Sequence, residues 1–214
     1  MTTTTDTAAL METWIQGWAA ARGLAPPVAQ GAGWRVEVDQ PEQLRRHVFA
    51  GDCATLRELG ATVHEPWVWL KACMSVEALR ALLPPRWTVR EALGYFMTFE
   101  DAPPAALPLP DGYALGVTRE GGVDHACIHA ADGVLAADGR VVVVDGCAII
   151  DRIGTHEAHR RRGLGRTVMC ALHAAARERG ARRGLLVATQ DGHALYTTLG
   201  WAVQAPYASA VISG

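Results

Sequence analysis

The segment Arg160-Arg161-Arg162-Gly163-Leu164-Gly165 has the residue types of an anion-binding turn. It lies between a predicted strand at 147–153 and a predicted helix that runs from Leu164 to about Arg179. The first N–H groups of a helix have no partner within it, and the helix dipole adds partial positive charge there. Glycines let a phosphate approach the backbone, and the arginines add charge and donors. The sequence therefore predicts an anion site at this turn.

Two common nucleotide-binding motifs do not fit this segment. A Walker loop needs Gly-Lys-Ser/Thr, whereas Gly165 is followed by Arg166 and Thr167. A dinucleotide fingerprint needs a third glycine where Val168 stands. A solvated arginine cluster before an ordinary helix is one alternative, and nucleic-acid binding is another. The formal net charge of -2 argues against nucleic-acid and anionic-membrane partners.

The remaining composition points to no metal, no disulfide framework and no membrane span. His156 and His159 are three residues apart, but no third ligand is evident, so no metal site is predicted. No C-x-x-C pair is present, and an odd cysteine count favours reduced thiols and a cytoplasmic location. We see no signal peptide and no apolar run of about 18 residues. The five cysteines are Cys53, Cys73, Cys127, Cys147 and Cys170.

The elements around the turn predict a mixed sheet. Strands are expected at 113–119, 123–130 and 140–144, with turns at Asp132-Gly133 and Asp138-Gly139. After the long helix comes a buried, parallel-type strand at 184–189. A short helix over 192–199, which Asp191 is expected to cap, and a last strand at 202–211 complete the chain.

Two segments in this order resemble the GNAT superfamily of acetyltransferases. Arg160-x-x-Gly163-x-Gly165 is similar to its pyrophosphate loop, Arg/Gln-x-x-Gly-x-Gly/Ala. The later Ala194-Leu195-Tyr196-x-x-Leu199-Gly200-Trp201 is similar to a shortened form of its Ala-x-x-Leu-Tyr-x-x-x-Gly-Phe ending. The resemblance covers about residues 110–214. It implies an α/β (α+β) fold with a mixed sheet. The expected architecture is a GNAT-like acyltransferase core with an N-terminal α+β extension.

The resemblance implies a cofactor site for acetyl-CoA as co-substrate. The strand before the turn would offer main-chain groups of Ile153 and Thr155 to the pantetheine arm. The family often has an apolar residue in place of Thr155 and proline in place of Glu157, so the chain departs mildly here. The pyrophosphate would be held by Arg160, Arg161, Arg162, Gly163, Leu164, Gly165 and Arg166, with a hydroxyl added by Thr167.

Two residues are implied as catalytic. Tyr196 matches the tyrosine that many members use as general acid toward the departing thiolate. Its alternative role is to pack beside Leu195 and Leu199. Asp151, on the strand ahead of the turn, is a candidate base for the amine, directly or through water. Its alternative role is an ion pair with Arg152.

The N-terminal half, residues 1–105, is expected to be a separate α+β region, or to supply the first elements of the acyltransferase fold. Four prolines within 101–111 mark a stiff connector and a boundary before the domain at 110–214. A helix over 10–22 should carry Trp14 and Trp18 on one face. This pair could dock a partner, but packing onto the body of the protein is the expected outcome. No internal sequence repeat is present.

Within this half, a strand is expected at 34–38, followed by a helix that Asp39 and Pro41 open and that continues through Phe49. Further helices are expected at 53–63 and 76–83, and strands at 67–70 and 94–99. Four tryptophans either line an acceptor pocket or, more commonly for such residues, fill the core: Trp34, Trp67, Trp69 and Trp87. Lys71 is the only lysine against nineteen arginines, a bias that discourages assigning a role to any one arginine.

These features together predict an N-acyltransferase that moves an acetyl group from acetyl-CoA directly to a small amine or amino acid. The alternative is a catalytically silent acyl-CoA-binding sensor or interaction protein. Acceptor specificity in this superfamily lies in variable loops, so the sequence leaves the acceptor, the acyl length and the oligomeric state open. A homodimer is compatible with it.

Overall fold

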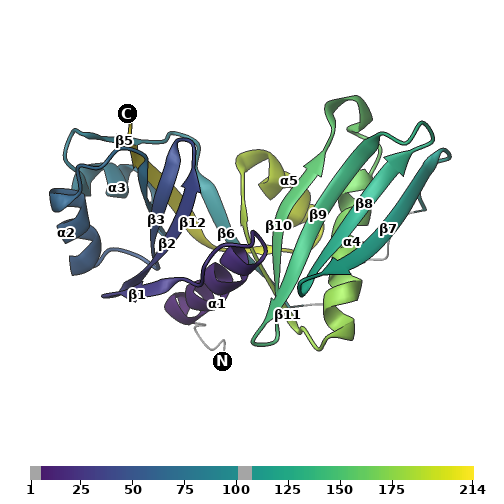
Figure 1. Cartoon of the computed structure of the whole chain (residues 1–214), viewed down its shortest axis with the longest axis horizontal. Coiled ribbons are helices and arrows are strands. Elements are labelled where there is room, and N and C mark those ends of the chain that lie inside the picture. Colours follow the sequence, from purple (N-terminus) through teal and green to yellow (C-terminus); the bar gives the residue numbers. More distant parts are fainter. Residues whose placement is uncertain (1–5, 101–107) are drawn as a thin grey trace.

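The computed structural model describes residues 6–100 and 108–214, which form one mixed sheet with helices on its faces (Figure 1). In chain order the elements are α1 (Thr7–Ala20), β1 (Val28–Gln30), β2 (Gly33–Gln40), β3 (Gln43–Phe49), α2 (Ala54–Thr62), β4 (Val68–Ala72), α3 (Val76–Leu82), β5 (Trp87–Val89), β6 (Gly94–Phe99), β7 (Tyr113–Glu120), β8 (Val123–Ala130), β9 (Leu135–Val144), β10 (Cys147–Thr155), a 3-10 turn (Glu157–His159), α4 (Leu164–Glu178), β11 (Arg183–Ala188), α5 (Gln190–Thr198) and β12 (Ala202–Ile212). The predicted α/β class with a mixed sheet is confirmed.

The C-terminal half follows the predicted order of elements. Strands β7 to β10 form an antiparallel meander, and β10 then pairs parallel with β11. A parallel pair needs a crossover, which α4 supplies. Its apolar stripe recurs every fourth residue and is buried against the sheet: Leu164, Val168, Leu172 and Ala176.

The N-terminal half repeats this order of elements. Strands β1, β2 and β3 form an antiparallel meander, and β3 pairs parallel with β4 through the crossover helix α2. A second helix, α3, leads to β5, which lies antiparallel to β12, and then to β6. The two halves thus share a topology, although no internal repeat is detectable in the sequence.

The two halves exchange their last strands. Strand β6 pairs antiparallel with β11, Gly184 opposite Phe99. Strand β12 pairs with β6 through its first part and with β4 through its last part, Ala208 opposite Ala72. The sheet order is therefore β1-β2-β3-β4-β12-β6-β11-β10-β9-β8-β7. Figure 1 shows β6 and β12 running between the two halves.

Helix α1 lies in the crease between the halves (Figure 1). Asp6 caps it by accepting a hydrogen bond from the Ala8 amide. Trp14 and Trp18 are buried, and the Trp14 ring contacts Phe96 and Tyr207 with ring centroids 6.2 and 5.8 Å apart. The predicted packing of this helix onto the body is confirmed.

The helix expected through Phe49 is wrong, because residues 43–49 form strand β3. Asp39 and Glu42 have φ values of 50° and 59°, which reverse the chain into a hairpin. The following residues then pair on one side with β2 and on the other with β4. Pairing with a distant strand has outweighed the local helix signal.

Two smaller expectations in the C-terminal half are also wrong. Asp138 and Gly139 lie inside β9 instead of in a turn. A Cβ on Gly139 would lie 2.3 Å from Cδ1 of Ile153, so this glycine of β9 allows close packing of the Ile153 side chain from β10. Helix α5 is capped by Thr189, which accepts from the Gly192 amide, and not by Asp191.

The proline-rich boundary falls mostly on residues 101–107, which lie outside the described residues, and the division into two domains stays a prediction. None of the described helices combines the length and the apolar character that crossing a membrane requires.

Candidate functional site between β10 and β11

The strands β10 and β11 part soon after they meet. They pair only from Cys147 to Ile149, opposite Arg183 to Leu185. Beyond Ile149, β10 stays with β9 through a bulge between Asp151 and Gly154, where Arg152 has a φ of 54°. The other edge of β10 has no paired strand there among the described residues. This edge carries Ile153 and Thr155, whose main-chain groups the family resemblance would place beside the pantetheine arm.

The glycine-containing turn directly follows this open edge. Arg161 and Gly163 have φ values of 63° and 79°, and α4 begins at Leu164 with no side-chain cap on its first amides. Such alternation of backbone conformations makes a concave nest of N–H groups. The nest at the dipolar start of α4 has the form of an anion site. The side chains of Arg160, Arg161 and Arg162 are exposed around it.

Two residues in the first turn of α4 face inward. A Cβ on Gly165 would lie 3.4 Å from Oγ1 of Thr155 and 3.3 Å from Cδ2 of Leu195, so the loop packs closely on β10 and α5. Thr167 is buried, and its hydroxyl lies 3.4 Å from the carbonyl oxygen of Gly163. Its hydroxyl is thus directed at the backbone of its own helix. Nε of Arg166 is buried with no hydrogen-bond partner among the described residues.

Tyr196 lies on α5 and is 8% exposed. Its ring contacts Trp201, with centroids 6.1 Å apart. Burial raises the pKa of Tyr196 to about 12, and the charge of Asp151 adds to that effect. The phenol is therefore protonated at neutral pH, the state that a proton donor needs.

Asp151 forms an ion pair across the crease, and its partner is Arg22 instead of the expected Arg152. Nε and Nη2 of Arg22 lie 2.9 and 3.0 Å from the two carboxylate oxygens of Asp151. Arg22 follows α1 and also lies over the Trp18 ring, 4.5 Å from its centroid. This bidentate pair ties the end of α1 to β10.

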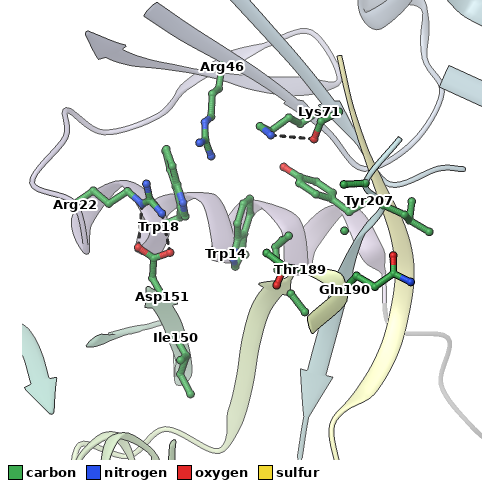
Figure 2. Close-up of a pocket in the computed structure, with 16 residues that line it drawn as sticks. Trp14, Trp18, Arg22, Arg46, Lys71, Ile150, Asp151, Thr189, Gln190 and Tyr207 are labelled. Atoms are coloured by element: carbon green, nitrogen blue, oxygen red, sulfur yellow. Dashed lines mark hydrogen bonds and ion pairs between the residues drawn. The ribbon is translucent and has the colours of Figure 1, made fainter. Parts of the chain in front are cut away.

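A cavity of about 260 Å³ opens where the strands part (Figure 2). Both halves of the molecule line it: Trp14, Trp18, Arg22, Arg46, Lys71, Ala92, Leu93, Gly94, Ile150, Asp151, Val187, Ala188, Thr189, Gln190, Tyr207 and Ser209. The four tryptophans proposed for an acceptor pocket are not in this lining. Trp14 and Trp18 line the cavity, and they also pack α1 onto the sheet.

The charge of the cavity comes from residues that the sequence did not single out. Arg46 lies over Trp18 at 4.3 Å, and burial lowers its pKa to about 10. Nζ of Lys71 donates to Oγ of Ser209 at 2.9 Å, and burial beside three arginines lowers its pKa well below the usual range. These two basic side chains come from separate strands, so no sequence motif could have joined them.

Of the two histidines next to the turn, His159 contacts Tyr113. The rings of His156 and His159 are 5.9 Å apart, and Nδ1 of His159 lies 2.8 Å from the Tyr113 hydroxyl. Over residues 6–100 and 108–214 there is no group of three or more His, Cys, Asp or Glu residues placed to hold a metal ion.

Comparison with known proteins shows which family and which folds the chain is similar to. The model of the acetyltransferase (GNAT) family matches residues 79–201. A GCN5-related N-acetyltransferase from Kribbella flavida is similar over 98% of this chain and 96% of its own, with 17% identity and a TM-score of 0.68. A GCN5-related N-acetyltransferase-like protein from Streptococcus suis is similar over 97% of this chain and 97% of its own, with 14% identity and a TM-score of 0.61.

A third solved structure is a tandem GNAT protein from the clavulanic acid biosynthesis pathway. It covers 99% of this chain and 97% of its own, with 15% identity and a TM-score of 0.54. At such identities these similarities establish the fold, and they extend it over both halves of the chain. Among curated protein sequences, none matches the chain significantly.

Proposed function

Because the chain belongs to the acetyltransferase (GNAT) family, we propose that it moves an acetyl group from acetyl-CoA directly to the nitrogen of a small amine. One observation carries the proposal. The cavity lies where β10 and β11 part, and the turn that has the form of an anion site follows the open edge of β10. A long thioester substrate with a pyrophosphate at one end and a reactive acyl group at the other suits this layout.

The residues of the turn and of β10 fit the donor substrate. In this proposal the amides from Arg161 to Arg166 hold the pyrophosphate, and the side chains of Arg160 to Arg162 add charge. The open edge of β10 at Ile153 and Thr155 pairs with the amide groups of the pantetheine arm, as a strand would. The glycines at positions 163 and 165 allow the backbone to approach the phosphates.

The chemistry needs two proton transfers. The neutral amine attacks the thioester carbonyl carbon, the C–N bond forms and the C–S bond breaks. Tyr196 is the proposed donor of a proton to the leaving thiolate, and its high pKa suits a donor. Asp151 is the proposed acceptor of the amine proton. Since Arg22 occupies both carboxylate oxygens, we favour transfer through a water molecule.

A thiol-release assay with acetyl-CoA and a panel of amines tests this function. Free coenzyme A should appear only when an accepted amine is present, together with the N-acetylated amine in equal amount. The product is identified by mass. Tight binding of acetyl-CoA without turnover on any amine would contradict the enzyme and support an acyl-CoA sensor.

A further inference from the structure

Two hydrogen-bond donors at the cavity are buried and have no partner among the described residues. They are the hydroxyl of Tyr207 and Nε of Arg46. Tyr207 is only 4% exposed, and it lines the cavity together with Arg46. Buried donors are almost always satisfied in folded proteins. An unsatisfied pair that lines one cavity therefore points to a ligand that accepts hydrogen bonds.

A third donor lies beside these two. Strands β3, β4 and β12 are neighbours in the sheet, and they carry Arg46, Lys71 and Tyr207 respectively. Lys71 is opposite Ser209 in register and donates to its hydroxyl. Figure 2 shows the three side chains reaching toward the same space beside Trp14 and Trp18. Three donors from adjacent strands thus converge on one wall of the cavity.

The charges at this wall are not balanced by protein groups. Of the residues described as lining the cavity, Asp151 alone carries a carboxylate, and Arg22 holds both of its oxygens. Neither Arg46 nor Lys71 has an ion-pair partner within the described part of the chain. A cationic wall with convergent donors in a confined space selects a small anion.

We infer that the acceptor is a small amine that also carries a carboxylate, and that Arg46, Lys71 and Tyr207 bind this carboxylate. The inference rests on the proposed acetyl transfer and specifies its acceptor. The planar guanidinium of Arg46 matches a carboxylate, and the hydroxyl of Tyr207 adds a donor. The amine end of the acceptor then faces the gap between β10 and β11, at Asp151 and Thr189.

The position of the cations assigns the carboxylate to the acceptor and not to the acyl group. The proposed path of acetyl-CoA lies between β10 and β11. The three hydrogen-bond donors lie instead on β3, β4 and β12. An acetyl group is too short to fill the cavity between them. A bifunctional acceptor, amine at one end and carboxylate at the other, fits both ends.

Matched substrates test the inference on the full chain. Amino acids of several sizes are each compared with their carboxamides, at equal concentrations of neutral amine, with saturating acetyl-CoA. Loss of a hydrogen-bonded charge should lower kcat/KM for the carboxamide by about 10- to 100-fold. Equal kcat/KM for acid and carboxamide overturns the inference and leaves acetyl transfer standing.

Variants assign the effect to the three residues. Tyr207→Phe and Arg46→Gln should raise KM for the carboxylate substrate about tenfold or more and leave KM for acetyl-CoA unchanged. Arg45→Gln is the matched control, because Arg45 pairs with Glu37 and Glu65 and is not in the cavity lining. If Arg45→Gln raises KM for the carboxylate substrate as much as Arg46→Gln does, the assignment is wrong.

Lys71→Met separates binding from folding. A methionine keeps the apolar length and removes the amine, which is costly to bury beside Arg46, Arg22 and Arg90. The variant should therefore unfold at the same temperature as the wild type or higher, while it loses carboxylate affinity about tenfold. A folded Lys71→Met protein with unchanged carboxylate affinity removes this residue from the site.

Binding without acetyl-CoA keeps the inference separate from the proposed function. Titration calorimetry of the same amino acids should show binding that Arg46→Gln weakens, even if no transfer occurs. The inference is overturned if neither binding nor turnover depends on both the carboxylate of the ligand and Arg46. Turnover of succinyl-CoA with an uncharged amine is measured last. If Arg46→Gln lowers kcat/KM only with succinyl-CoA, the carboxylate belongs to the acyl group and the acceptor assignment fails.

Discussion

At the scale of single residues, the site contains a protonated phenol and an ion-paired carboxylate. Tyr196 is enclosed by α5 and Trp201, and its environment stabilises the neutral phenol. Asp151 is held by Arg22, which follows a helix more than a hundred residues earlier in the chain. Burial raises the pKa of Tyr196, and the charge of Asp151 adds to that effect. A neutral phenol is the form that the proposed proton donor needs.

Replacement of Tyr196 by phenylalanine tests that role. With the hydroxyl gone, we expect kcat to fall by about 10²-fold or more, while the affinity for acetyl-CoA stays within a factor of two or so. The fold should be retained because the ring and its contact with Trp201 remain. Steady-state kinetics and calorimetry measure the two quantities. Unchanged kcat would assign Tyr196 to packing.

The pH profile follows from the same residue. A group whose pKa is raised stays protonated to a higher pH, so Tyr196 remains a proton donor until pH approaches about 12. The kcat of the wild type should therefore not decline between pH 8 and about pH 10 through loss of this proton. A decline centred near the ordinary tyrosine pKa of about 10 would mean that Tyr196 is not buried as described.

At the scale of elements, the start of α4 follows closely on the open edge of β10. The turn forms because Arg161 and Gly163 adopt left-handed backbone conformations, and only the second of these residues does so without a steric cost. The bulge in β10 keeps that strand with β9 and away from β11. One element therefore supplies free amides and the other an open edge, on the same side of the parting.

A substitution in this turn tests the donor site. Gly163→Glu adds a side chain at a φ of 79° and a negative charge beside the proposed pyrophosphate, so acetyl-CoA affinity should fall at least about tenfold. Gly180→Glu is the control, because Gly180 has a similar φ of 83° just beyond the other end of α4, with open space around it. Calorimetry gives both affinities. Equal affinities in the two variants would rule out the loop assignment.

At the scale of the whole molecule, the exchanged strands make each half depend on the other. Strand β6 completes the C-terminal half and β12 completes the N-terminal half. Helix α1 then seals the crease with apolar contacts to Ile149 and Leu185. The cavity lies at this junction, so its lining is assembled only when both halves are in place.

The exchange predicts that the halves do not fold separately. A fragment of residues 108–214 lacks β6 and α1, which leaves an unpaired edge on β11 and exposes Ile149 and Leu185. We expect this fragment to aggregate or to lack a cooperative transition, whereas the full chain unfolds in one transition. Scanning calorimetry and circular dichroism compare them. A fragment that melts cooperatively near the temperature of the full chain would support two independent domains.

The elements near the turn could be predicted because their signals are local. Three elements have the expected types and nearly the expected bounds: β6, β10 and α4. Their signals, periodicity and glycine positions, come from residues that are close together in the chain. The residues 43–49 could not be predicted in this way. Their strand depends on β4, which lies some twenty residues further on.

The sequence by itself indicated the family, the glycine-containing turn and the candidate Tyr196, since each rests on short segments of contiguous residues. Only the tertiary structure decided the strand exchange, the Arg22 partner of Asp151 and the cavity with Arg46, Lys71 and Tyr207. These features come from five or more elements that are far apart in the chain. Their side chains meet through packing across the crease, and such pairing leaves no regular spacing in the sequence.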